Sequence, residues 1–142
     1  MIHGNYIDGD WVEGPAVTPD INPSDVSETV GEYAQGDATA AETAIAAAKQ
    51  ALPAWSLASP QQRFDVLDAA GTQVLARRAE LAELLAREEG KQLGEATGEV
   101  NRAGHILKFF AGEALRNSGE LLPSVRPGMT VELTREPVGV VG

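Results

Sequence analysis

The side chains that most often carry acid–base, nucleophilic or metal chemistry are sparse in this 142-residue chain. The two histidines, His3 and His105, lie far apart in the sequence, and there is no cysteine. A chain without cysteine has no disulfide, no thiolate metal ligand and no cysteine nucleophile of its own. We therefore expect no catalytic residue and no metal site within these residues.

Two further patterns are weak as catalytic signals. His105 could form a triad only with Ser118 or Ser124, and neither serine lies in a Gly-x-Ser-x-Gly turn. We interpret His105 as a partly exposed histidine within a helix. Glu88 and Glu89 are adjacent, so on a helix they point about 100° apart and cannot converge as an acid–base pair. They are predicted to belong to a solvated helix face.

The last residues combine glycines with a strand pattern. Gly139-x-x-Gly142 lacks the G-x-G-x-x-G spacing and a following helix, so we expect no cofactor-binding residue here. The run Val138–Val141 is apolar on both faces, which is typical of an inner strand of a parallel sheet. Such a strand reaches its neighbour through a crossover of a dozen or more residues. We therefore interpret the chain as a fragment that stops inside a larger sheet.

Composition narrows the classes of partner. Twenty-one acidic residues against eleven basic ones give a net charge of −10, which disfavours nucleic acid because phosphate binding needs a basic face. The acid-rich, lysine-poor balance favours a salt-adapted, halophilic protein, although a moderately acidic mesophilic protein has a similar composition. No signal peptide or membrane span is recognisable, so we expect a cytoplasmic protein without a membrane partner.

The first third of the chain has the signals of short strands. Asp8-Gly9 lies between two β-prone runs within 5–12, and this pair favours the primed turn of a β-hairpin. Gly14-Pro15 is expected to end that strand, and Asn22-Pro23 marks a loop. A further strand is predicted at about 28–34.

Apolar residues then recur at helical spacing and predict four helices. Asp37 is expected to cap the first, which ends near Pro53, and Ser59 followed by Pro60 opens the second. The third is predicted at about 79–89, with Gly90 as its left-handed stop and an ion pair between Glu83 and Arg87. The fourth is predicted at about 94–117, with an apolar stripe of Val100, Ala103, Leu107, Phe110 and Ala114.

A second hairpin is predicted after the helices. Two extended runs at 120–125 and 129–134 flank the turn Arg126-Pro127-Gly128. Alternation in the second run indicates a strand with one buried face. Because an isolated two-stranded hairpin is marginal in water, this arm must pack on another part of the protein.

Several segments in this order resemble the opening of aldehyde dehydrogenases. They are Gly9–Val12, Asn22-Pro23, Ala54-Trp55, Arg63, Glu89-Gly90-Lys91-Gln92, Glu99 and Arg135–Gly142. Gln92 departs from the proline frequent in the family. The resemblance covers nearly the whole chain. It implies an α/β fragment with an N-terminal β-hairpin, four mainly antiparallel helices and a protruding β-hairpin. Its domains would be the N-terminal part of the cofactor-binding domain at 1–118, an oligomerisation hairpin at 119–136 and the start of a Rossmann-like sheet at 137–142.

The resemblance also implies an activity. The family oxidises aldehydes with NAD or NADP, and its cysteine nucleophile and glutamate base lie beyond Gly142, so the fragment is expected to be inactive alone. The segments 109–116 and 119–128 are most similar to the branch acting on α-ketoglutaric semialdehyde, with a succinate-semialdehyde enzyme as the second choice. The full-length protein is expected to be a dimer or tetramer. A free-standing helical adaptor is the competing interpretation, and it requires a chain that folds by itself.

In the family, one side of the fourth helix lines the substrate tunnel. The resemblance implies that Arg102, Ile106 and Phe109, which share a strip with Glu113, lie along that tunnel. Arg102 would then attract a substrate carboxylate. The alternative is a surface ion pair between Arg102 and Glu99, three residues earlier on the helix.

Overall fold

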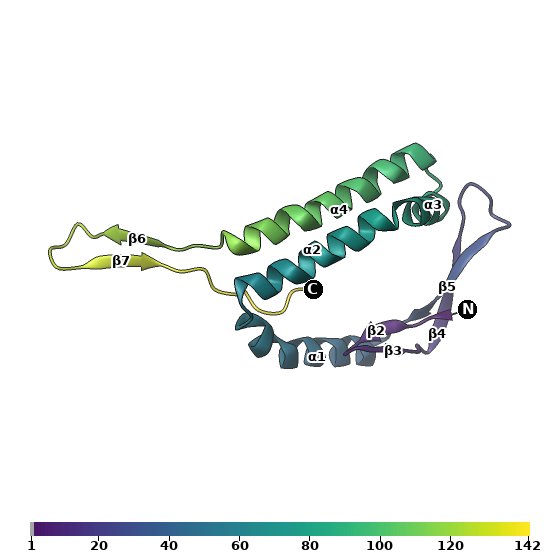
Figure 1. Ribbon diagram of the computed structural model, residues 1–142. Coiled ribbons are helices and arrows are strands. Elements are labelled where there is room, and N and C mark those ends of the chain that lie inside the picture. Colours follow the sequence, from purple (N-terminus) through teal and green to yellow (C-terminus); the bar gives the residue numbers. More distant parts are fainter. Residues whose placement is uncertain (1) are drawn as a thin grey trace.

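The computed structural model describes residues 2–142 and has the α/β composition predicted from the sequence (Figure 1). In chain order the elements are β1 (Ile2–His3), β2 (Asn5–Ile7), β3 (Asp10–Val12), β4 (Ala16–Ile21), β5 (Thr29–Gln35), α1 (Ala38–Ser56), α2 (Pro60–Ala76), α3 (Arg78–Glu89), α4 (Leu93–Leu115), β6 (Glu120–Pro123) and β7 (Thr130–Leu133). Within residues 2–142, no helix combines the length and apolar character that crossing a membrane requires.

The N-terminal strands form two small sheets. Strands β2 and β3 pair antiparallel, and their turn has a positive φ at Asp8 (53°) and Gly9 (90°), which confirms the predicted hairpin. Strand β5 pairs antiparallel with β4 and parallel with β1, in the order β1-β5-β4. Strand β4 was not predicted, because Gly14-Pro15 and Pro19 are strand-breaking signals. Proline is tolerated here because β4 is an edge strand.

Local capping residues set the helix starts. The carboxylate of Asp37 accepts a hydrogen bond of 2.8 Å from the Ala40 backbone N–H. Ser59 and Gln62 form a reciprocal capping box, in which each side chain accepts from the other's backbone N–H at 3.2 and 2.8 Å. These contacts confirm both predicted starts. Helix α1 nevertheless continues through Pro53 to Ser56, one turn beyond the predicted end.

Helices α2 and α4 run antiparallel side by side and make the main tertiary contact (Figure 1). Their backbones meet at two glycines. A Cβ added to Gly71 would lie 2.9 Å from the carbonyl oxygen of Gly104, and one added to Gly104 would lie 2.6 Å from Cγ of Leu75. Beside this contact, Lys108 Nζ donates to Asp68 Oδ1 at 2.7 Å and to Thr72 Oγ1 at 2.8 Å. The absence of side chains on both glycines therefore sets the spacing of the two helices.

The buried stripe of α4 differs from the predicted one. Its buried residues are Ala96, Val100, Gly104 and Ala111. Ala103 is exposed and Phe110 is 55% exposed, so the prediction is wrong for these two residues. The physical reason is that the contact is centred on Gly104, a residue that a search for apolar side chains does not count. Positions 71 and 104 themselves leave no room for a side chain, because Leu75, Leu107 and Lys108 already pack against them.

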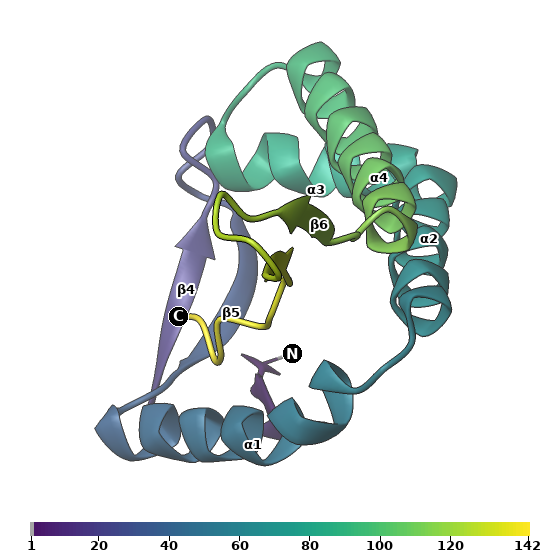
Figure 2. The same ribbon diagram turned by 90° about the vertical axis from the view of Figure 1, so that its left-hand side faces the viewer.

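Helix α1 lies apart from the α2–α4 pair, as both ribbon views show (Figures 1 and 2), and its contacts are chiefly with β2. No residue of α1 is buried. Helix α3 links the pair, and it packs on α4 through a cluster that contains Ala82, Ala96 and Val100. The antiparallel arrangement thus describes α2 and α4, while α1 and the N-terminal strands form a separate side of the molecule.

The β6–β7 hairpin projects from the helices as predicted (Figure 1). Both strands are shorter than expected and exposed along their length. Residues 134–142 have no regular secondary structure, so the strand expected at 137–142 is not formed. A strand needs a neighbour for its backbone hydrogen bonds, and no strand among residues 2–142 pairs with this segment.

We expect the substitution Gly104→Ala to lower the free energy of unfolding by about 1–3 kcal/mol, because the new methyl group collides with Leu75. The matched control is Gly98→Ala on the same helix, where the added Cβ meets nothing within 4 Å. This control should raise stability by about 0.5–1 kcal/mol through helix propensity. Urea unfolding followed by circular dichroism measures both changes, and equal effects of the two substitutions would contradict the proposed glycine contact.

Candidate functional site

The strip predicted from the sequence lies on the face of α4 that points away from α2. Gly104 marks the contact face, and Arg102, Ile106 and Phe109 lie on the opposite side, where all three are exposed. The ring of Phe109 meets that of Phe110 edge-on at 5.3 Å between centroids. One cation, one aliphatic side chain and two aromatic rings therefore share an open helix surface.

The alternative partner of Arg102 is engaged elsewhere. Glu99 Oε1 accepts a hydrogen bond of 2.7 Å from Lys91 Nζ, and Lys91 also pairs with Glu89. These hydrogen bonds, first the one that Lys91 donates to Glu89 and then the one to Glu99, raise the pKa of Lys91. The predicted Glu99–Arg102 pair is therefore wrong, since Lys91 approaches Glu99 from the loop before α4. Within residues 2–142, the Arg102 guanidinium has no ion pair.

This surface has the chemistry to bind a small organic anion. A guanidinium group can hold a carboxylate through two parallel hydrogen bonds, and nearby apolar side chains can cover a short carbon chain. Because the three side chains lie on an open helix face, a closed pocket would require further protein over Arg102, Ile106 and Phe109.

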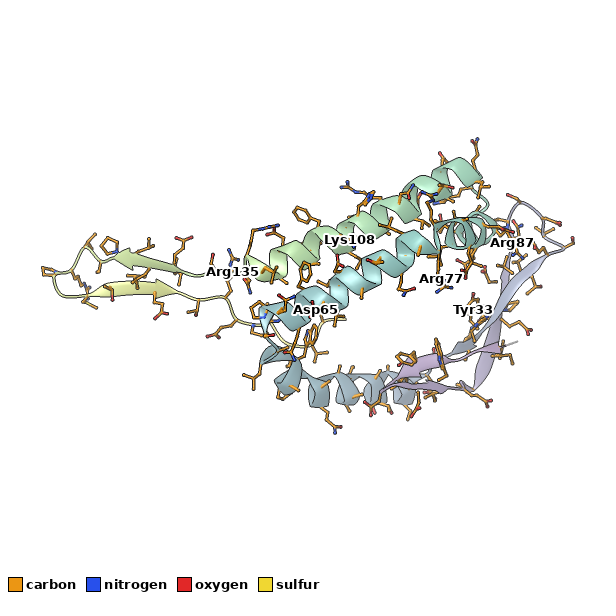
Figure 3. The ribbon with its side chains drawn as sticks, viewed as in Figure 1. Tyr33, Asp65, Arg77, Arg87, Lys108 and Arg135 are labelled. Atoms are coloured by element: carbon orange, nitrogen blue, oxygen red, sulfur yellow. The ribbon has the colours of Figure 1, made fainter. Side chains whose placement is uncertain are left out.

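An ion-pair network links the β4–β5 loop to α3 at Arg87, which Figure 3 labels near that loop. Arg87 donates to Glu28 Oε1 through Nε at 3.0 Å and through Nη2 at 2.5 Å. The Asn22 side chain donates to the other Glu28 oxygen at 2.7 Å. The bonds from Asn22 and then Arg87 lower the pKa of Glu28. The predicted Glu83–Arg87 pair is not the ion pair formed, because the loop brings Glu28 to Arg87 instead.

Two more hydrogen bonds join the same elements. Tyr33 on β5 donates to Glu88 Oε1 at 3.2 Å, so Glu88 is not simply solvated. Ser24 Oγ donates to the Gly90 carbonyl at 3.3 Å. Gly90 itself has the predicted left-handed φ of 67°. The β4–β5 loop and β5 thus hold the end of α3 in place, and α4 begins directly after it. Sequence reasoning missed these contacts, because they join residues far apart along the chain.

The remaining candidates from the sequence are the two histidines and the glycines of the last segment. His105 is exposed on α4, and His3 stacks on Tyr33 at 5.0 Å between ring centroids. The described residues contain no group of histidine and carboxylate side chains that could hold a metal ion. Gly139 and Gly142 lie in a segment without regular secondary structure.

Comparison with known proteins gives matches along almost the whole chain. Residues 11–142 match the aldehyde dehydrogenase family. An alpha-ketoglutaric semialdehyde dehydrogenase of Bacillus subtilis is 37% identical over 97% of the chain, and an alpha-ketoglutarate semialdehyde dehydrogenase of Haloferax volcanii is 36% identical over 96%. A glutarate-semialdehyde dehydrogenase of Pseudomonas aeruginosa is 32% identical over 95%. The chain spans only 28–29% of the length of these relatives.

Solved structures give the same result. Betaine aldehyde dehydrogenase of Staphylococcus aureus, in complex with NAD+, superposes with a TM-score of 0.89 at 30% sequence identity. The match covers 96% of this chain and 28% of that enzyme. A 3,6-anhydro-L-galactose dehydrogenase matches with a TM-score of 0.83 at 25% identity. The arrangement of separated α1, paired α2 and α4, and projecting arm is therefore one that these enzymes share.

The Glu28 network predicts a stability difference that depends on pH. The folded-state pKa of Glu28 lies below its ordinary value of 4.5, so the carboxylate stabilises the fold above that value. This stabilisation is lost as the pH falls through the lower folded-state pKa. Glu28→Gln should therefore lower the urea midpoint at pH 7 and have a smaller effect at acidic pH.

The control for this prediction is Glu42→Gln on α1, which removes a carboxylate that has no ion pair among residues 2–142. Its urea midpoint should stay close to that of the original chain at both pH values. A pH-independent effect of Glu28→Gln would contradict the role given to the ionised carboxylate.

Proposed function

Because this chain belongs to the aldehyde dehydrogenase family, we propose that it supplies the amino-terminal region of an NAD(P)-dependent enzyme that oxidises an aldehyde to a carboxylic acid. The observation that carries this proposal is the match of residues 11–142 to the family together with a TM-score of 0.89 to an NAD+ complex. The nucleophile, the base and the dinucleotide site are assigned to residues outside this chain. The choice between NAD and NADP is left open.

The proposed substrate is a semialdehyde that carries a carboxylate, such as α-ketoglutaric semialdehyde. Two relatives at 37% and 36% identity are named for this substrate, and others are named for glutarate and malonate semialdehydes. The guanidinium of Arg102, which has no ion pair within residues 2–142, lies on one strip with Ile106 and Phe109 and supports the same chemistry. In the proposal, these three residues line the substrate tunnel and Arg102 attracts the carboxylate. Succinate semialdehyde remains the second choice.

The structure offers little support for the helical adaptor. Among residues 2–142, no large side chain is fully buried, and both tryptophans are exposed, Trp11 at 71% and Trp55 at 49%. A protein that folds and acts alone normally buries its large apolar residues. These surfaces are consistent with a region that further protein covers.

Several finer assignments belong to the same proposal. The region 1–118 would form part of the cofactor-binding domain, and 119–136 would join subunits into a dimer or tetramer. The exposed, unpaired edges of β6 and β7 suit that role. The salt-adapted surface and the cytoplasmic location stay predictions from composition.

We expect the purified 142-residue chain to have no measurable aldehyde dehydrogenase activity. Loss of a nucleophile alone costs several orders of magnitude in rate. NADH or NADPH formation from α-ketoglutaric semialdehyde, followed by absorbance, tests this expectation. Turnover above that of a mock purification from the same host would contradict it.

A chimera tests the substrate role of Arg102. In it, this chain replaces the matching segment of the Bacillus subtilis relative, and Arg102 is changed to leucine. With a carboxylate-bearing semialdehyde, Arg102→Leu should lower kcat/KM about ten- to a hundredfold, mainly through KM, because a charge-assisted hydrogen bond of roughly 1.5–3 kcal/mol is lost. An uncharged aldehyde of similar length should be little affected.

The matched control is Arg78→Leu in the same chimera, since Arg78 is an exposed arginine on α3 away from the strip. It should leave both substrates unchanged. Equal losses on the charged and uncharged aldehydes would assign Arg102 a structural role, and no loss on either would place it outside the substrate path. An inactive parent chimera would argue against the proposed family function itself.

A further inference from the structure

We infer that a groove at the base of the β6–β7 arm binds a small polyvalent oxyanion, a phosphate or a dicarboxylate. The groove lies between the first turn of α2 and the last turn of α4, where the arm begins. Three arginines line it, Arg63 from α2, Arg116 from the end of α4 and Arg135 from the segment after β7. Figure 3 shows Arg135 at the point where the arm meets the helices.

The charge of this groove is opposite to that of the chain. The chain has a net charge of −10 and only eleven basic residues, and three of these gather here. Glu113 is the one carboxylate among the described residues that line this groove. It is already engaged by Arg116, whose Nε and Nη2 donate to Glu113 Oε1 at 2.9 and 2.7 Å. An anion entering the groove therefore meets an excess of positive charge.

The arginines also keep hydrogen-bond donors for a ligand. Arg63 is half-buried and directs Nε and Nη2 to the Ala58 carbonyl at 3.2 and 2.5 Å, which fixes its orientation. Arg135 donates once, through Nε to the Ser118 carbonyl at 3.3 Å. A guanidinium has five N–H groups, so each of the three arginines retains at least three without a hydrogen bond to residues 2–142. Such forked donors match the oxygens of phosphates and carboxylates.

The neighbouring side chains suit a small ligand. Asn117 lines the groove and offers an amide, and Phe110 gives it an apolar wall. The three arginines of the groove are remote from Arg102, because Arg102 and Arg116 lie about 20 Å apart along α4 at 1.5 Å rise per residue; among the described residues, only Phe110 and Glu113 adjoin both surfaces. The inference therefore does not rest on the proposed function.

The test is a calorimetric titration of the 142-residue chain with inorganic phosphate, against sodium chloride at the same ionic strength. We expect saturable binding of phosphate alone. Arg116→Gln and Arg135→Gln should each weaken it roughly tenfold, since each removes charge-assisted hydrogen bonds. Arg78→Gln, which removes the same charge from an exposed position on α3, should leave the affinity unchanged. Succinate should bind and acetate should bind far more weakly, because acetate offers one carboxylate to the three arginines.

Arg116→Lys and Arg135→Lys separate geometry from charge, and circular dichroism verifies that every variant folds. Weaker binding by the lysine variants supports the forked contact. An equal loss with Arg78→Gln, or no saturable phosphate binding, would overturn the inference. Sedimentation equilibrium tests the other source of carboxylates, a second copy of the chain. Self-association that Arg116→Gln and Arg135→Gln abolish, without phosphate binding, would also overturn it.

Discussion

The close contact of α2 and α4 at Gly71 and Gly104 is the constraint on which the rest of the structure depends. It brings two long helices together at two buried glycines, with Leu75 and Leu107 packed against them. Three of the four buried hydrophobic residues within 2–142 are alanines. A contact fixed by backbone approach tolerates little rotation, since any turn of α4 would drive a side chain into Leu75 or the α2 backbone. The same contact therefore decides which residues of α4 face outward. Arg102, Ile106 and Phe109 form one surface because Gly104 lies on the other.

A second set of contacts fixes the end of α3, from which α4 starts. Glu28 reaches α3 from the β4–β5 loop and Tyr33 from β5, and Lys91 joins the turn after α3 to Glu99 on α4. Each of these pairs is at least partly open to solvent and contributes little to stability alone. These pairs matter because hydrogen bonds are directional. Charge-assisted hydrogen bonds between residues far apart in the sequence allow few alternative positions of the β4–β5 loop. The helix pair sets the spacing, and this network sets where α4 begins.

The parts of the fold that the sequence predicted are those governed by neighbours along the chain. Asp37, Ser59 and Gly90 act within one turn of their own helices, and the Asp8-Gly9 turn needs only its own backbone conformation. By contrast, β4 forms because β5 offers it an edge, and the buried face of α4 is decided by α2. Arg87 likewise pairs with Glu28 and not with Glu83. Helical spacing could not predict this pair, because Glu28 lies in a loop far away in the sequence.

The candidate site shows the same division. Helical periodicity alone placed Arg102, Ile106 and Phe109 on one strip, and the structure keeps them together. Whether Arg102 pairs with Glu99 could not be read from the spacing, because Lys91 competes for that carboxylate from outside the helix. The arginine groove was also missed, as its members come from three separate segments. Residues that meet only after folding leave no local pattern.

The isolation of α1 has a consequence for how the molecule fluctuates. Helix α1 has no buried residues and contacts mainly the three-residue strand β2. Its local unfolding should therefore cost much less free energy than the separation of α2 from α4. Backbone amides of α1 and of the arm should exchange with solvent long before those near Gly71 and Gly104. We therefore expect a slowly exchanging helical pair with two flanks that open more readily. If further protein docks on those flanks, amide protection there should increase without a change of fold.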